Sequence, residues 1–118
     1  MNQKMNQLPP WLTLRIPEIR SLCSQCHIRS LYLVGSILRP DDFRSGSDID
    51  WVYEFDRDQI PDSAFLDNLT FFWDQLEQLT GRRADLIHYT SLKNPYFIQE
   101  IDETRLLIYD AQRQEVPV

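Results

Sequence analysis

The segment LYLVGSILRPDDFRSGSDIDWVYEF, residues 31–55, decides the fold that the rest of the sequence supports. It begins with a short apolar run from Leu31 to Val34 that Gly35 closes, which indicates a buried strand. It ends with an alternating run from Asp48 to Phe55, which predicts a second strand. Between the two runs, Ser36 to Arg39 could open a short helix, and residues 40–47 have the composition of a loop.

The alternation divides the second predicted strand into two faces. Trp51, Tyr53 and Phe55 share one face, which we expect to be core. Asp48 and Asp50 share the opposite face, only a few ångströms apart, at the start of an otherwise apolar strand. The segment therefore places two carboxylates side by side on a rigid element.

Upstream of this segment, the sequence predicts one helix and a leader. Pro17 suits a first helical turn, and apolar residues at helical spacing continue to about His27. Residues 1–11 are polar and end in Pro9-Pro10, so we expect a loose N-terminal leader.

Downstream, helical and strand patterns alternate. Asp62 or Ser63 could cap a long helix, which Gly81 ends. The remaining expected elements are a strand at 84–89, a helix that Asn94 caps, a strand at 106–109, and a polar tail at 111–118. This order predicts one domain over residues 1–118 with an α/β (α+β) fold, a small mixed β-sheet backed by helices.

Composition limits the function. Of the 118 residues, 18 are acidic and 12 basic, for a net charge of -6, which lacks the basic footprint of a protein that grips nucleic acid. The apolar runs are too short to span a membrane, and the N-terminus lacks the apolar core of a signal peptide. We therefore expect a cytoplasmic protein with no membrane or nucleic-acid partner.

Gly35 and Ser36 end the first predicted strand. A glycine lets the backbone approach a phosphate closely, and free N–H groups with a serine hydroxyl attract anions. The dipeptide alone is weak evidence, because many strands end in an ordinary Gly-Ser turn.

Asp48 and Asp50 would repel each other unless a cation lies between them or one carries a proton. A rigid strand is what a site needs to hold Mg²⁺ in octahedral geometry. The competing interpretation is a solvated strand end or a capped turn.

Asp85 is a single acid inside the apolar run around Leu86 and Ile87. Burying it requires a metal ion, an arginine or a hydrogen bond. If its strand neighbours the second strand, Asp85 completes a cluster of three carboxylates, and a salt bridge to Arg82 or Arg83 is the alternative. Three aspartates beside a phosphate-accepting turn are the equipment of two-metal phosphoryl chemistry.

Gly35-Ser36, a spacer, Asp48-x-Asp50 and a distant strand aspartate together resemble the DNA polymerase beta-type nucleotidyltransferases, above all the minimal nucleotidyltransferase (MNT) branch. The resemblance covers about residues 31–92 and implies a nucleotidyltransferase fold. It implies that the three aspartates are catalytic metal ligands. The candidate nucleotide-binding residues are Gly35, Ser36, Arg39 and Ser47.

The resemblance also implies an activity and partners. The expected reaction is Mg²⁺-dependent transfer of a nucleotide, AMP from ATP, to a hydroxyl, with two ions and a nucleoside triphosphate as substrate. Members of the MNT branch are often paired with HEPN-type proteins as toxin and antitoxin, so we expect a HEPN-type partner or a homo-oligomer. Pro40 stands where the family commonly has glycine, which affects how Arg39 and Arg44 are aimed.

Two rival functions remain open at this point. One is a binding module, an antitoxin that neutralises its partner by contact alone. The other is a small-molecule nucleotidyltransferase that modifies an antibiotic. Substitution of Asp48 and Asp50 would separate an enzyme from a purely steric inhibitor.

Several other features have simpler explanations. Cys23 and Cys26, with His27, spell a haem-attachment pattern, yet both cysteines fall on the apolar stripe of the first helix. His88 is expected on the face opposite Asp85, and Glu54 farther along the strand from Asp50 is expected to be a solvated carboxylate. Phe71 lies off the stripe of the long helix, which marks it as a candidate dimer or partner contact.

Overall fold

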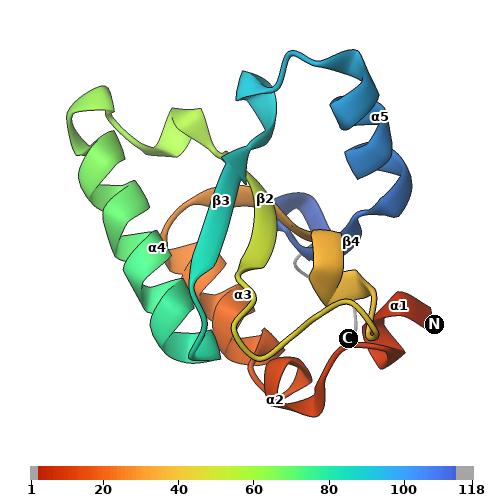
Figure 1. Cartoon of the computed structure of the whole chain (residues 1–118). Helices are drawn as coiled ribbons and strands as arrows, with labels where there is room; N and C mark the ends of the chain where they lie inside the picture. The colour runs from red at the N-terminus through yellow and green to blue at the C-terminus, as the bar shows by residue number, and fades with distance from the viewer. Residues whose placement is uncertain (1–2, 114–118) are drawn as a thin grey trace.

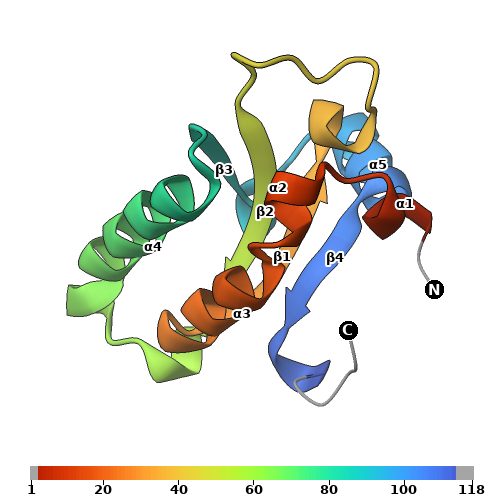
Figure 2. The same cartoon turned by 90° about the horizontal axis from the view of Figure 1, so that it is seen from below.

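A computed structural model describes residues 3–113 as one mixed β-sheet with helices on both faces (Figures 1 and 2). The strands are β1 (Ile28–Val34), β2 (Ile49–Phe55), β3 (Ala84–His88) and β4 (Leu106–Asp110). The sheet order is β3-β2-β1-β4, with β2 and β3 parallel and the other two pairs antiparallel. The predicted fold class is confirmed, and from residue 16 onward so is the predicted order of strands and helices.

The helices are α1 (Gln3–Asn6), α2 (Pro10–Thr13), α3 (Ile16–Gln25), α4 (Phe65–Thr80) and α5 (Pro95–Thr104). Short 3₁₀ turns connect them, among them η1 (Gly35–Leu38), η3 (Asp62–Ala64), η4 (Tyr89–Ser91) and η5 (Ala111–Arg113). Within the described residues, no helix is long and apolar enough to cross a membrane.

The two faces of β2 pack as the alternation predicts. Trp51, Tyr53 and Phe55 are buried in the main core. The helices α3 and α4 cover this face of the sheet (Figure 2). On the other face, Val34 and Val52 form a smaller core with Ile101 of α5. The helix α5 covers only part of this face, and the remainder carries the predicted site.

Local signals set the helix boundaries. Gly81 ends α4 in the left-handed conformation, with φ 69°. The side chain of Asn94 accepts hydrogen bonds from the N–H groups of Tyr96 and Phe97 and so caps α5. Pro17 lies in the first turn of α3, where no N–H is needed. The predicted cap of the long helix at Asp62 or Ser63 is wrong, because both residues lie in η3 and α4 begins at Phe65 with Ala64 at the N-cap position.

The predicted loose leader at residues 1–11 is wrong for its described part. The chain forms α1 and α2 there, and Leu8 and Leu12 are 5% and 0% exposed in the main core. The two helices are not predicted because each is a single turn, which is too short to show helical periodicity in the sequence. At the other end, the predicted tail begins with η5, and residues 114–118 lie outside the described part of the chain.

Candidate functional site

The sheet topology brings the predicted acids to one edge. Because β1 and β2 are antiparallel and β2 and β3 are parallel, the end of β1 meets the starts of β2 and β3. Val34 pairs with Asp50, and Asp50 pairs with Asp85. Partners in a parallel pair point to the same face, so both carboxylates lie on the face that α5 only partly covers. From the sequence, Asp85 is expected to join Asp48 and Asp50 only if its strand neighbours the second strand, and β3 does pair with β2.

Gly35 stands against Asp50. Its φ is 79°, a conformation that side chains other than glycine rarely adopt, and a Cβ built on it would lie 2.5 Å from Oδ2 of Asp50. The glycine therefore makes room for a carboxylate. From the sequence, Gly35 is expected only to let the backbone approach a phosphate, and its contact with Asp50 is not predicted.

The three acids differ in their surroundings. Asp50 is half-buried, whereas Asp48, just before β2, and Asp85 are exposed. Burial, and then the negative charges of Asp85 and Asp48, raise the pKa of Asp50, while Arg39 acts in the opposite direction. The side chains thus form an electrostatic cluster centred on Asp50.

The cluster has the donor chemistry of a magnesium site. Carboxylate oxygens are the ligands that Mg²⁺ takes from proteins, and the ion pairs within residues 3–113 include none of the three acids. Among the same residues, no three acidic, histidine or cysteine side chains already converge tightly enough to enclose an ion. Binding an ion there would require the carboxylates to move closer together, and a cation would offset their mutual repulsion.

The alternative account of Asp85, a salt bridge to Arg82 or Arg83, is wrong, because the ion pairs of the described residues include neither of them with Asp85. The guanidinium of Arg82 donates instead to the backbone carbonyls of Arg44 and Ser45. Its Cζ also lies over the rings of Trp11 and Phe43. These contacts reach 37 or more residues along the chain. No local sequence pattern signals them, so sequence reasoning missed this role of Arg82.

The candidate nucleotide-binding residues lie along the segment that connects β1 to β2. Ser36 lies in η1, directly after Gly35, and its carbonyl accepts the N–H of Arg39 at 2.9 Å. Nε of Arg39 pairs with Oδ2 of Asp42 at 2.6 Å, with both side chains more than half exposed. Oγ of Ser47 accepts the backbone N–H of Arg44 at 3.0 Å. Ser47 therefore shapes the loop before Asp48, and the ion pair with Asp42 holds the side chain of Arg39 within the same loop.

The histidine, cysteine and phenylalanine side chains for which the sequence suggests simpler roles lie outside the acid cluster. His88 stacks on Tyr53, with ring centroids 5.0 Å apart, on the face opposite Asp85. Cys23 and Cys26 are free and buried, and burial raises the pKa of the Cys26 thiol to about 11. Phe71 is 50% exposed on α4, as predicted for a contact residue.

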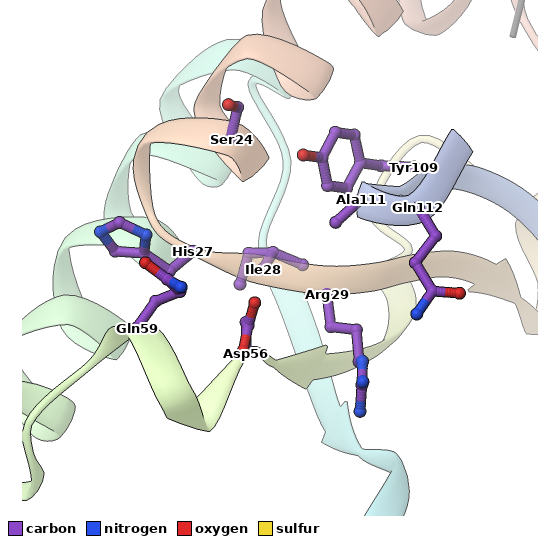
Figure 3. A pocket seen from close by; sticks show the side chains of 9 residues that line it. All are labelled: Ser24, His27, Ile28, Arg29, Asp56, Gln59, Tyr109, Ala111 and Gln112. Atoms are coloured by element: carbon purple, nitrogen blue, oxygen red, sulfur yellow. The ribbon is translucent and has the colours of Figure 1, made fainter. Parts of the chain in front are cut away.

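A separate pocket of about 380 Å³ lies at the opposite end of the sheet (Figure 3). Polar side chains line it at the start of β1, the end of β2 and the end of β4, among them His27, Arg29, Asp56 and Gln112. The nine described residues that line this pocket include none of the predicted site residues.

The fold and the acid cluster define a nucleotide-transfer domain, and comparison with known sequences agrees. Residues 18–114 match the family described as "Polymerase beta, Nucleotidyltransferase". A protein of Methanocaldococcus jannaschii named "Putative protein adenylyltransferase MJ1379" is 36% identical over 83 residues, 70% of this chain and 76% of the relative. The chain belongs to the polymerase beta nucleotidyltransferase family and is a nucleotidyltransferase.

Solved structures share the fold. One described as "putative minimal nucleotidyltransferase" has a TM-score of 0.63 at 24% identity, over 80% of this chain and 90% of that one. A toxin–antitoxin complex with AMP-PNP has a TM-score of 0.58 at 19% identity, over 85% and 77%. A tri-AMPylated HEPN toxin of Shewanella oneidensis in complex with an MNT antitoxin has a TM-score of 0.54 at 17% identity, over 86% and 75%.

Proposed function

We propose that this nucleotidyltransferase uses Mg²⁺ to transfer AMP from ATP to a hydroxyl of a partner protein, and that the partner is a HEPN-type toxin. The observation that carries the proposal is the pairing of Asp50 with Asp85 across β2 and β3, with Asp48 two residues before Asp50 and Gly35 beside it. Three carboxylates around a glycine turn suit a metal-bound triphosphate.

Asp48 and Asp50 would hold one Mg²⁺, and Asp85 would share a second. Such ions neutralise the triphosphate and lower the pKa of the acceptor hydroxyl. The acceptor hydroxyl would lose its proton to solvent, and its oxygen would bond to the α-phosphorus as the bond from that phosphorus to the β-phosphate oxygen breaks and pyrophosphate leaves. Ser36 would donate its hydroxyl to the phosphates, and Arg39, once released from Asp42, would add a positive charge. Positioning and charge neutralisation account for most of the rate in such chemistry.

Two lines support a protein hydroxyl as acceptor. The relative from Methanocaldococcus jannaschii carries the name of a protein adenylyltransferase. The structural neighbours include an AMPylated HEPN toxin bound to its MNT antitoxin. The chain also exposes large aromatic side chains on two helices, Phe71 on α4 and Tyr96 on α5, which suits contact with another protein.

The test begins with calorimetric titration of a non-hydrolysable ATP analogue, with and without Mg²⁺. The wild type is expected to bind only with Mg²⁺, and Asp48→Asn/Asp50→Asn to lose binding. The wild type and the double variant are then incubated with ATP, Mg²⁺ and a HEPN-type toxin. Mass spectrometry of the toxin is expected to show added AMP only with the wild type.

The rival function predicts a different outcome. An antitoxin that acts by contact alone would neutralise its partner equally well with or without the Asp48→Asn/Asp50→Asn substitutions. If the double variant keeps full neutralising power and the wild type adds no AMP, the enzymatic proposal fails. Transfer of AMP to an aminoglycoside-type antibiotic, and not to protein, would instead identify a small-molecule enzyme.

A further inference from the structure

The side chain of Arg82 ties together three segments that are distant in the sequence. Its guanidinium Cζ lies 4.9 Å from the ring centroid of Trp11 and 5.3 Å from that of Phe43. One of its terminal nitrogens donates to the carbonyl of Arg44 at 3.3 Å and also to the carbonyl of Ser45. The segments are the α2 helix, the loop before β2 and the turn before β3.

The loop that Arg82 holds, residues 39–47, connects η1 to β2 and so leads from the Gly35 turn to Asp48 (Figure 1). Both ends of this loop are closed by local hydrogen bonds. Asp42 N–H donates to the carbonyl of Arg39 at 2.9 Å, and Ser47 N–H donates to the carbonyl of Arg44 at 2.9 Å. Arg82 supplies the long-range hydrogen bonds to the middle of the loop.

The turn that carries Arg82 is itself fixed. Thr80 Oγ1 accepts the N–H of Arg82 at 3.2 Å, and Glu77 Oε2 accepts the N–H of Ala84 at 2.7 Å. The carbonyl of Arg83 accepts the N–H of Ile49 at 2.9 Å, where β2 starts. Arg82 therefore projects from a rigid base, three residues before Asp85, onto the loop that ends at Asp48.

The loop has room to move if this tie is lost. A cavity of about 410 Å³ lies between the residues before α2 and the loop, and its lining includes Pro9, Trp11, Phe43, Ser45 and Arg82. Asp48 is exposed and precedes the first ladder residue of β2. The hydrogen bond from Ile49 N–H to the Arg83 carbonyl fixes the peptide after Asp48 but not the φ angle or the side chain of Asp48. The position of the Asp48 carboxylate relative to Asp50 and Asp85 therefore depends on the loop.

We propose that Arg82 is a positioning residue of the nucleotide site, which holds the loop 39–47 so that Asp48 stays beside Asp50 and Asp85. The inference rests on the proposed function, because it gives Asp48 a metal-binding task. A guanidinium is needed because it is flat enough to lie against two aromatic rings and still donates in its plane to backbone carbonyls, whereas lysine is a point charge.

The test compares Arg82→Ala and Arg82→Lys with the matched control Arg83→Ala, which removes the same charge from the exposed neighbouring position. Hydrogen–deuterium exchange of residues 39–47 is measured without nucleotide, and the affinity for Mg²⁺ with the ATP analogue by calorimetry. In Arg82→Ala, loop exchange is expected to rise about tenfold or more while β1 and β2 keep their protection. The analogue is expected to bind about tenfold more weakly in both Arg82 variants, and as in wild type in Arg83→Ala.

Chemical rescue distinguishes positioning from general stability. Guanidinium ion at about 50 mM, well below denaturing concentrations, is expected to restore part of the loop protection and affinity of Arg82→Ala, but to do nothing for wild type. Unchanged loop exchange in Arg82→Ala overturns the inference. So does an equal loss of protection across the whole sheet in both variants, since Arg82 would then support the fold at large. If the wild type itself binds no ATP analogue, the proposed function fails. Faster loop exchange in Arg82→Ala would then show that Arg82 stabilises the loop without a role in nucleotide binding.

Discussion

Gly35 and Asp50 are so close that a methyl group on Gly35 would lie 2.5 Å from Oδ2 of the Asp50 carboxylate. The contact joins the end of β1 to the start of β2, where Val34 and Asp50 are register partners. Since φ at Gly35 is also 79°, both backbone conformation and space require glycine.

Substitution of the three glycines should separate these two requirements. Gly35→Ala combines strain and overlap and is expected to lower the free energy of unfolding by about 2–5 kcal/mol. Gly81→Ala has the same kind of φ, 69°, but open space, and should cost roughly 1–2 kcal/mol. Gly46→Ala, with neither constraint, should stay within about 0.5 kcal/mol. Urea unfolding measures all three, and equal losses at Gly35 and Gly81 would show that Asp50 simply moves aside.

Asp50→Asn is expected to stabilise the protein at pH 7 without divalent cations. Burial and the neighbouring acids raise the pKa of Asp50 above its usual 3.8, so between 3.8 and the raised value the native state binds more protons than the unfolded state. The contribution of this carboxyl to the stability of the folded state is therefore present below pH 3.8 and lost as pH rises through the raised pKa. Asparagine carries no charge, so the Asp50→Asn variant does not lose this stability at pH 7.

Because Asp50 is only half-buried, we expect a gain of about 1 kcal/mol or less, seen as a small rise in Tm at pH 7. Thermal unfolding from pH 3.5 to 7 in EDTA measures it, with Glu100→Gln, an exposed acid on α5, as control. The difference from wild type should shrink toward low pH. A variant less stable than wild type at pH 7 would contradict the electrostatic account.

Asp85→Asn should separate transfer from nucleotide binding. Asp85 is exposed at the start of β3 and is proposed to share the ion that activates the acceptor, not the one on the triphosphate. Transfer of AMP is expected to fall about 100-fold or more, with affinity for the ATP analogue within about threefold.

Glu54→Gln is the matched control for Asp85, since Glu54 lies on the same face of the sheet, farther along β2. Single-turnover kinetics measure the rate of AMP transfer, and calorimetry measures the affinity for the ATP analogue. Equal losses of binding and transfer in Asp85→Asn would place Asp85 on the triphosphate ion instead.

The N-terminal segment should contribute to stability. Leu12 is 0% exposed in the main core, and Leu12→Ala is expected to cost about 2–5 kcal/mol of unfolding free energy. Leu14, 75% exposed two residues later, provides the control, and Leu14→Ala should change stability by less than about 0.5 kcal/mol. Similar small effects at both positions would mean that the segment docks only weakly.

Much of the fold could be predicted because its signals are local. The alternation in β2 correctly divided Trp51 from Asp50, and the Asn94-Pro95 pair correctly marked the start of α5. Gly81 correctly ended α4. The errors fall where an element is one turn long or where its stability comes from distant packing, as at Leu8 and Leu12.

The sequence by itself determined that Gly35, Asp48 and Asp50 are candidate site residues, because their type and spacing are set within one continuous segment. Only the tertiary structure decided that Asp85 joins them, since the parallel pairing of β3 with β2 is a contact between segments 35 residues apart. It alone also showed that Gly35 makes room for Asp50 and that Arg82 holds the loop before Asp48. Local patterns encode which way a side chain points, whereas packing of distant segments decides what it meets.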